Sequence, residues 1–120
     1  MTTQQATMQA ITVRKAVQQL NLTVLNDAGL EREITGGYAS DLLSCVMAGA
    51  REGNIWVTLQ AHPNIIAVAS LVGLSAIVIT EGMQPDEETL RRANSENITV
   101  LTTTQNTFTI VGKLAALGID

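Results

Sequence analysis

The side chains that could perform chemistry are few in this sequence. It contains one histidine, His62, and one cysteine, Cys45. A histidine beside a carboxylate can move protons near neutral pH, so one hypothesis is an enzyme that uses His62 with Asp41 or Glu81. A lone histidine more often makes a local hydrogen bond to the backbone. Cys45 lies beside the apolar face of an expected helix, which predicts a small core residue rather than a nucleophile.

The motifs that mark common catalytic sites are absent. The sequence has no G-x-x-x-x-G-K-[ST], no G-x-G-x-x-G, no G-x-S-x-G and no C-x-x-C. Gly112-Lys113 lacks both the earlier glycine and the following serine or threonine of a phosphate-binding loop. One histidine and one cysteine far apart in sequence do not form a metal site. We therefore predict a non-catalytic protein with no metal and no cofactor.

Composition limits the class of protein further. The chain has 120 residues, which is the size of one domain, and 46% of them are hydrophobic. A net charge of −4 argues against a nucleic-acid partner, which would require clustered cations. A single cysteine and no visible secretory signal predict a cytoplasmic location. The stretch 54–80 contains no Asp, Glu, Lys or Arg, but Gln60, His62, Pro63 and Asn64 near its middle argue against a membrane span.

Strands and helices are expected to alternate along residues 11–120, after a polar tail over residues 1–10. Helical spacing predicts a helix over 11–20, and a strand over 22–25 follows it. Ser40 is a predicted N-cap of a helix that ends near Gly53. Three strand-helix units then recur at 55–60 and 63–72, 76–80 and 85–95, and 99–103 and 107–117. Such units pack as a mostly parallel β-sheet with helices on both faces, a three-layer α/β fold.

Ligands of open parallel sheets bind outside the carboxyl ends of the strands. The loops expected there expose helix N-termini, which suit a small polar or anionic ligand, including a nucleotide. Each position also has a purely structural interpretation: Gly36-Gly37 as a tight turn, and Ser40, Asn64 and Thr104 as helix caps. Trp56 is expected to serve in packing or at an interface. The candidate ligand-binding residues are Gly36, Gly37, Ser40, Asp41, His62, Asn64, Glu81, Gly82, Thr103 and Thr104.

Several fragments together resemble the DRTGG domain family, in a stand-alone form similar to the N-terminal domain of HPr kinase/phosphorylase. They extend over roughly residues 20–119 and include Thr35-Gly36-Gly37, Ser40-Asp41-Leu42-Leu43-Ser44, Trp56-Val57-Thr58, Gln60, His62, Asn64-Ile65, Ala67-Val68-Ala69 and Gly82. The Asp-Arg pair that names the family is replaced here by Glu33-Ile34. No role of that pair can be carried over, and the kinase domain with its phosphate-binding loop is absent.

The resemblance implies a regulatory or dimerising module of the same α/β fold. Stand-alone members are similar to companions of iron-hydrogenase-type redox systems and of histidine-kinase-like ATPases, which implies a partner protein of one of those kinds. Our first hypothesis is a homodimeric regulatory domain that senses a small polar ligand. The alternative is a structural interaction subunit of a redox or signalling complex that binds no small molecule.

Overall fold

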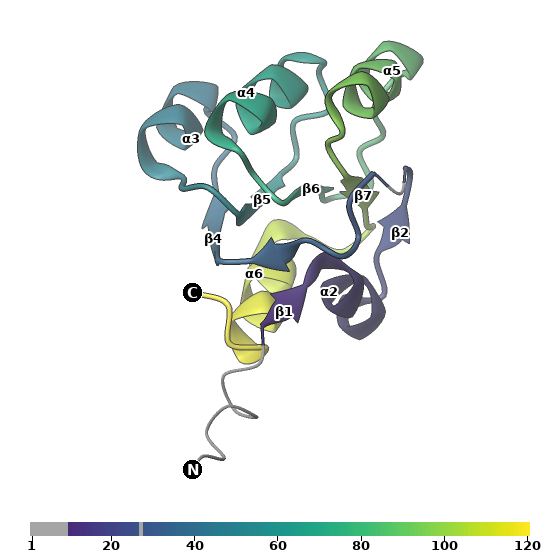
Figure 1. Ribbon diagram of the computed structural model, residues 1–120. Coiled ribbons are helices and arrows are strands. Elements are labelled where there is room, and N and C mark those ends of the chain that lie inside the picture. Colours follow the sequence, from purple (N-terminus) through teal and green to yellow (C-terminus); the bar gives the residue numbers. More distant parts are fainter. Residues whose placement is uncertain (1–9, 27) are drawn as a thin grey trace.

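The computed structural model describes residues 10–26 and 28–120, and its centre is a five-stranded sheet (Figure 1). The strand order is β2-β7-β6-β5-β4; the last four strands are parallel, and β2 joins β7 antiparallel. The mostly parallel α/β architecture predicted from the alternating pattern is thus confirmed. The sheet strands are β2 (Thr23–Val24), β4 (Gly36–Ala39), β5 (Asn54–Thr58), β6 (Ala76–Ile79) and β7 (Val100–Thr102).

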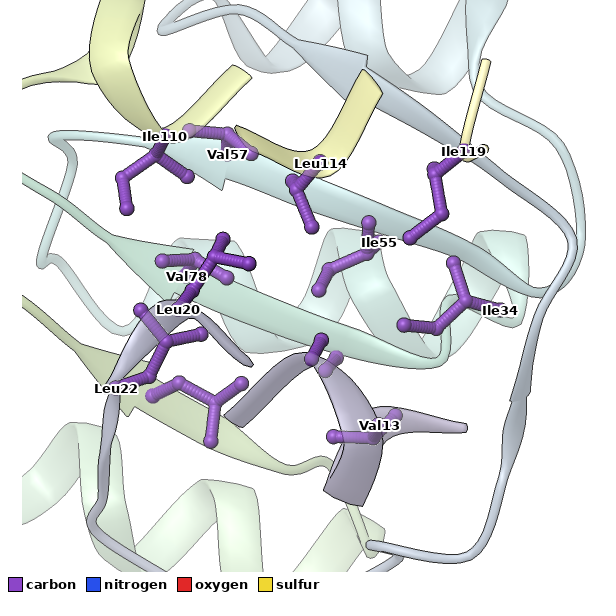
Figure 2. Close-up of a cluster of buried hydrophobic side chains, with 13 residues drawn as sticks. Val13, Leu20, Leu22, Ile34, Ile55, Val57, Val78, Ile110, Leu114 and Ile119 are labelled. Atoms are coloured by element: carbon purple, nitrogen blue, oxygen red, sulfur yellow. The ribbon is translucent and has the colours of Figure 1, made fainter. Parts of the chain in front are cut away.

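Helices cover both faces of the sheet, as the buried strand composition requires. One face carries α3 (Leu43–Gly49), α4 (Asn64–Val72) and α5 (Glu87–Glu96), and the other carries α2 (Val13–Leu20) and α6 (Thr107–Ala116) (Figure 1). Figure 2 shows Ile110 and Leu114 of α6 over the strand residues Val57 and Ile55. These two helical layers enclose two separate aliphatic clusters.

Trp56 lies in the core beneath α3 and α4. Its side chain is fully buried, and its indole Nε1 donates a hydrogen bond to the Ser40 carbonyl at 2.9 Å. The packing interpretation of this residue is therefore correct and the interface interpretation is wrong. Since most core residues are Ile, Val, Leu or Ala, this ring is the largest buried side chain.

Gly36 and Gly37 correct one prediction. They lie in the edge strand β4 at its amino end, paired with Asn54 and Ile55, and neither has a positive φ. They are therefore not part of a turn and not part of the loops that follow the strands. A side chain at Gly36 would meet the Asp120 carbonyl at 2.8 Å, so close backbone approach explains the residue there.

Other element bounds differ from the predicted ones. Residues 11–12 form the short strand β1 (Ile11–Thr12), antiparallel to β3 (Glu33–Ile34), and only then does α2 begin. The helix expected to begin at Ser40 and end near Gly53 occupies only 43–49, and β5 ends two residues before Gln60. Of the expected tail, residues 1–9 lie outside the described part of the chain.

Candidate functional site

The parallel strands end together on one side of the sheet, which we call the carboxyl edge. It consists of the segments 40–42, 59–64, 80–86 and 103–108, which follow β4, β5, β6 and β7. Eight of the ten candidate residues lie in these segments, because consecutive parallel strands end at the same side of a sheet. Gly36 and Gly37 do not, since they lie at the opposite, amino edge.

Asp41 joins two neighbouring loops of this edge. Its Oδ1 accepts hydrogen bonds from Thr58 Oγ1 at 2.8 Å and from the Leu59 amide at 2.9 Å. Gln60 Nε2 donates to the Asp41 carbonyl at 3.1 Å. The carboxylate therefore holds the loop after β5 against the loop after β4.

Ser40 does not cap α3, which corrects another prediction. Its hydroxyl accepts from the Leu42 amide at 3.1 Å, and Leu42 occupies the N-cap position without a side-chain cap. Asn64 and Thr104 are not caps either: Pro63 occupies the N-cap position of α4, and Asn106 caps α6. The Ser40 side chain instead closes a short turn onto Leu42, three residues before the first residue of the helix.

His62 makes the local hydrogen bond expected of a lone histidine. Its Nδ1 accepts from the Asn64 amide at 3.2 Å, which satisfies a donor in the first turn of α4. Asp86, the N-cap of α5, accepts from the Thr89 amide and hydroxyl, and these bonds lower the pKa of its carboxyl. The nearby His62 lowers that pKa further by electrostatic attraction. Both helix starts are thus satisfied from within the protein.

Glu81 and Thr103 complete the carboxyl edge. Glu81 has a φ of 64°, and its Oε2 accepts from the Thr107 amide at the start of α6 at 3.0 Å. The Gly82 amide donates to the Thr103 carbonyl, while the Thr103 hydroxyl accepts from the amide and the side chain of Gln105. Thr104 is exposed at the same edge.

These contacts decide what chemistry the carboxyl edge offers. The carboxylates of Asp41, Glu81 and Asp86 accept bonds from amides and hydroxyls that hold loops and helix starts. Within the described residues, no group of three or more His, Cys, Asp or Glu side chains gathers to hold a metal ion. Cys45 is exposed on α3, so its predicted place in the core is wrong.

Exposed apolar side chains at the carboxyl edge were missed in the sequence. Each parallel strand is followed by one: Leu42 after β4, Leu59 after β5, Met83 after β6 and Phe108 after β7. Phe108 is 88% exposed and Leu42 is 63% exposed. Their positions just beyond the predicted strand ends could have indicated a shared surface. A single apolar residue in a loop is common, however, and does not by itself indicate a binding site.

Surface hollows occur away from this edge. One of about 210 Å³ lies beside β4 and α6 and is lined mainly by apolar residues, among them Val57, Val111 and Leu114. Another, of about 420 Å³, lies at the amino edge and contains Arg32 together with Glu33, Glu52 and Glu96. No helix in the described part of the chain is long and apolar enough to cross a membrane.

Comparison with known proteins adds two positive findings. The sequence pattern of the family described as "DRTGG domain" matches residues 34–117. A crystal structure of the CBS and DRTGG domains of the regulatory region of Clostridium perfringens pyrophosphatase, complexed with the activator diadenosine tetraphosphate, shares the fold with a TM-score of 0.72 at 22% identity. The match covers 86% of this chain and 45% of that one, so this chain spans less than half of it. A search among curated proteins finds no match.

Proposed function

The chain belongs to the DRTGG domain family, and from this we propose that it is a non-catalytic regulatory domain that binds another molecule at its carboxyl edge. One observation carries the proposal: the acidic and hydroxyl groups of that edge are bonded to neighbouring loops and helix starts. A catalytic set requires a base or nucleophile within reach of a partner that activates it. The hydrogen bonds of these side chains hold the loops in place and so determine the shape of the surface at the carboxyl edge.

A small polar ligand is the first candidate for what binds there. The structurally similar region of the Clostridium perfringens pyrophosphatase is regulatory and carries a nucleotide activator, which makes nucleotides the first class to test. The side chains that would contact such a ligand are those in exposed segments of the edge: Asp41, His62, Asn64, Glu81, Gly82 and Thr104, with Ser40 and Thr103 beside them. A homodimer in the cytoplasm remains part of this proposal.

A protein partner is the second candidate, and a specific observation favours it. Leu42, Leu59, Met83 and Phe108 expose apolar surface around the same edge. Exposed apolar side chains gathered on one surface are typical of protein interaction sites. A redox enzyme or an ATPase is the kind of partner that the family resemblance implies.

Thermal unfolding with a panel of nucleotides, including ATP and diadenosine tetraphosphate, tests the ligand. A ligand at about 100 times its dissociation constant should add about 2.7 kcal/mol of stability, a shift of several degrees. The His62→Ala variant should lose that shift, whereas Glu52→Gln at the amino edge should keep it. Light scattering on the same samples measures the oligomeric mass.

The results separate the alternatives. A saturable shift that depends on His62 supports ligand sensing at the carboxyl edge. No shift of the unfolding temperature with any nucleotide, together with an unchanged oligomeric mass, favours the protein partner. Turnover of any nucleotide in the panel, lost in His62→Ala, would contradict the non-catalytic proposal.

A further inference from the structure

The exposed apolar residues of the carboxyl edge lie among carboxylates. Asp41 precedes Leu42, and its side chain binds the amide of Leu59. Glu81 binds the amide of Thr107, next to Phe108. Apolar and acidic side chains therefore alternate along this edge, in loops that the same hydrogen bonds hold in place.

Negative charge is concentrated on this side of the sheet. Five carboxylates lie in its loops or in the first turn of α5, which begins there: Asp41, Glu81, Asp86, Glu87 and Glu88. Fewer cations reach it: Lys113, whose Nζ donates to Gln105 Oε1 at 2.6 Å, and Arg92, which pairs with Glu88.

The hydrogen-bond partners of three of these carboxylates are uncharged amides and hydroxyls. Asp41, Glu81 and Asp86 accept from amides and hydroxyls, which stabilise a carboxylate without cancelling its charge. Glu88 is the member with an ion pair, to Arg92 at 3.4 Å. The surface thus presents net negative charge beside exposed apolar groups.

We propose that the carboxyl edge docks a positively charged, apolar segment of a partner protein. Lysine or arginine side chains of such a segment would face the carboxylates, while its apolar side chains would cover Leu42, Leu59, Met83 and Phe108. This inference rests on the proposed function, because the segment would bind at the same carboxyl edge. It specifies the chemistry of the partner that binds there.

Charge complementarity selects this occupant over others. The five carboxylates would repel the phosphates of a nucleic acid, of an anionic membrane or of a nucleotide, so the charge of this edge favours the protein partner over the nucleotide. A two-fold dimer through this edge would place the same carboxylates opposite their own copies, because such an interface is isologous. A cationic, apolar segment meets neither obstacle.

The test uses a fluorescent synthetic peptide in which lysine and leucine alternate, titrated with the full chain and followed by fluorescence anisotropy. We expect saturable binding that weakens as salt rises, and no binding of the same peptide with glutamate in place of lysine. Phe108→Ser should weaken binding about tenfold, because a large aromatic contact often carries much of the binding energy of an interface. Glu87→Gln should weaken it about threefold, as expected for one exposed charge.

Matched variants on other surfaces serve as controls. Leu71→Ser removes a side chain of 73% exposure on the outer face of α4, and Glu52→Gln removes a charge at the amino edge. Neither should change peptide affinity, and circular dichroism verifies that all four variants fold. Equal weakening by Leu71→Ser and Phe108→Ser would mean unspecific adhesion and overturn the proposal.

Two further outcomes would also overturn it. One is a dimer in the free protein that Phe108→Ser dissociates, which would make a second copy the occupant. The other is a nucleotide-induced thermal shift that depends on His62 without peptide binding; that result would preserve the regulatory function and reject only the basic partner. Peptide binding that is weakened by Phe108→Ser and Glu87→Gln, but not by Leu71→Ser or Glu52→Gln, supports the inference.

Discussion

At the scale of single residues, Thr99 stands out as a buried side chain without a partner. It is fully buried, and its Oγ1 makes no hydrogen bond within the described structure. Burying an unpaired hydroxyl costs free energy, whereas valine has the same shape without the polar atom. We expect Thr99→Val to raise the free energy of unfolding by about 1 kcal/mol, measured by urea denaturation.

Thr99→Ser provides the control for this substitution. It keeps the hydroxyl and removes the methyl group, so it should lower stability by about 1 kcal/mol through lost packing. A loss of stability in Thr99→Val comparable to that of Thr99→Ser would show that the hydroxyl has a partner, such as a bound water molecule.

The sequence predicted individual side chains unevenly. The local hydrogen bond of His62 was predictable, because its acceptor nitrogen lies two residues before the first turn of a helix. The position of Cys45 was not, because the rotation of a seven-residue helix about its axis depends on which neighbours it packs against. Ser40 and Asp41 were placed correctly at the carboxyl edge, but the partners of the Asp41 carboxylate are Thr58 at the end of β5 and Leu59 just after it, which no local pattern indicates.

At the scale of elements, Asp86 determines how α5 begins. Its carboxyl caps the helix through Thr89, and these bonds lower its pKa below the value of about 3.9 found in unfolded chains. Because the carboxyl has a lower pKa in the folded protein than in the unfolded chain, it stabilises the fold at pH values above its unfolded-state pKa. This stabilisation is lost as the pH falls through the folded-state pKa. Stability should therefore decrease below about pH 4 as this cap becomes protonated.

Two substitutions separate the cap from its charge. Asp86→Asn keeps an acceptor and should lose the part of the acid dependence that Asp86 causes, while Asp86→Ala should be less stable already at neutral pH. Thermal unfolding across the acid range compares them. Identical pH profiles for wild type and Asp86→Asn would exclude this titration.

Two glycines in different elements should respond in opposite ways to alanine. Gly36→Ala in β4 would bring a methyl group against the Asp120 carbonyl at 2.8 Å and Asn54 Nδ2 at 3.1 Å, so we expect a loss of about 1–3 kcal/mol. Gly112→Ala in α6 meets open space and should add up to about 1 kcal/mol through helix propensity. Denaturant unfolding measures both, and a neutral Gly36→Ala would show that the last residues can move aside.

Elements were predictable where composition and burial agree. Apolar residues form the centre of β5 and all of β6, both strands are buried throughout, and they were located within one or two residues. The strand β4 was missed because it begins with two glycines, which have low strand propensity. Its conformation depends on pairing with β5 and on contact with the chain end, both of which are remote in sequence.

At the scale of the whole molecule, the repeated strand-helix units were sufficient to predict a mostly parallel sheet covered on both faces. The carboxyl edge was predictable too, because parallel strands end at the same side of a sheet. The exposed apolar side chains among its carboxylates were missed, because they come from four loops spread over residues 40–108 and their exposure depends on the packing of those loops. The ligand-binding role of the candidate residues stays a prediction for the experiments above.

The contact between the last residues and β4 has a consequence for self-association. The Asp120 carbonyl accepts the Gly37 amide at 3.1 Å, on the border strand of the sheet. Unpaired groups on a border strand invite another chain to extend the sheet, and natural proteins often block them with covering segments. Asp120 covers the outward-facing amide of Gly37 in this way, so this part of the border strand is closed to pairing with another chain.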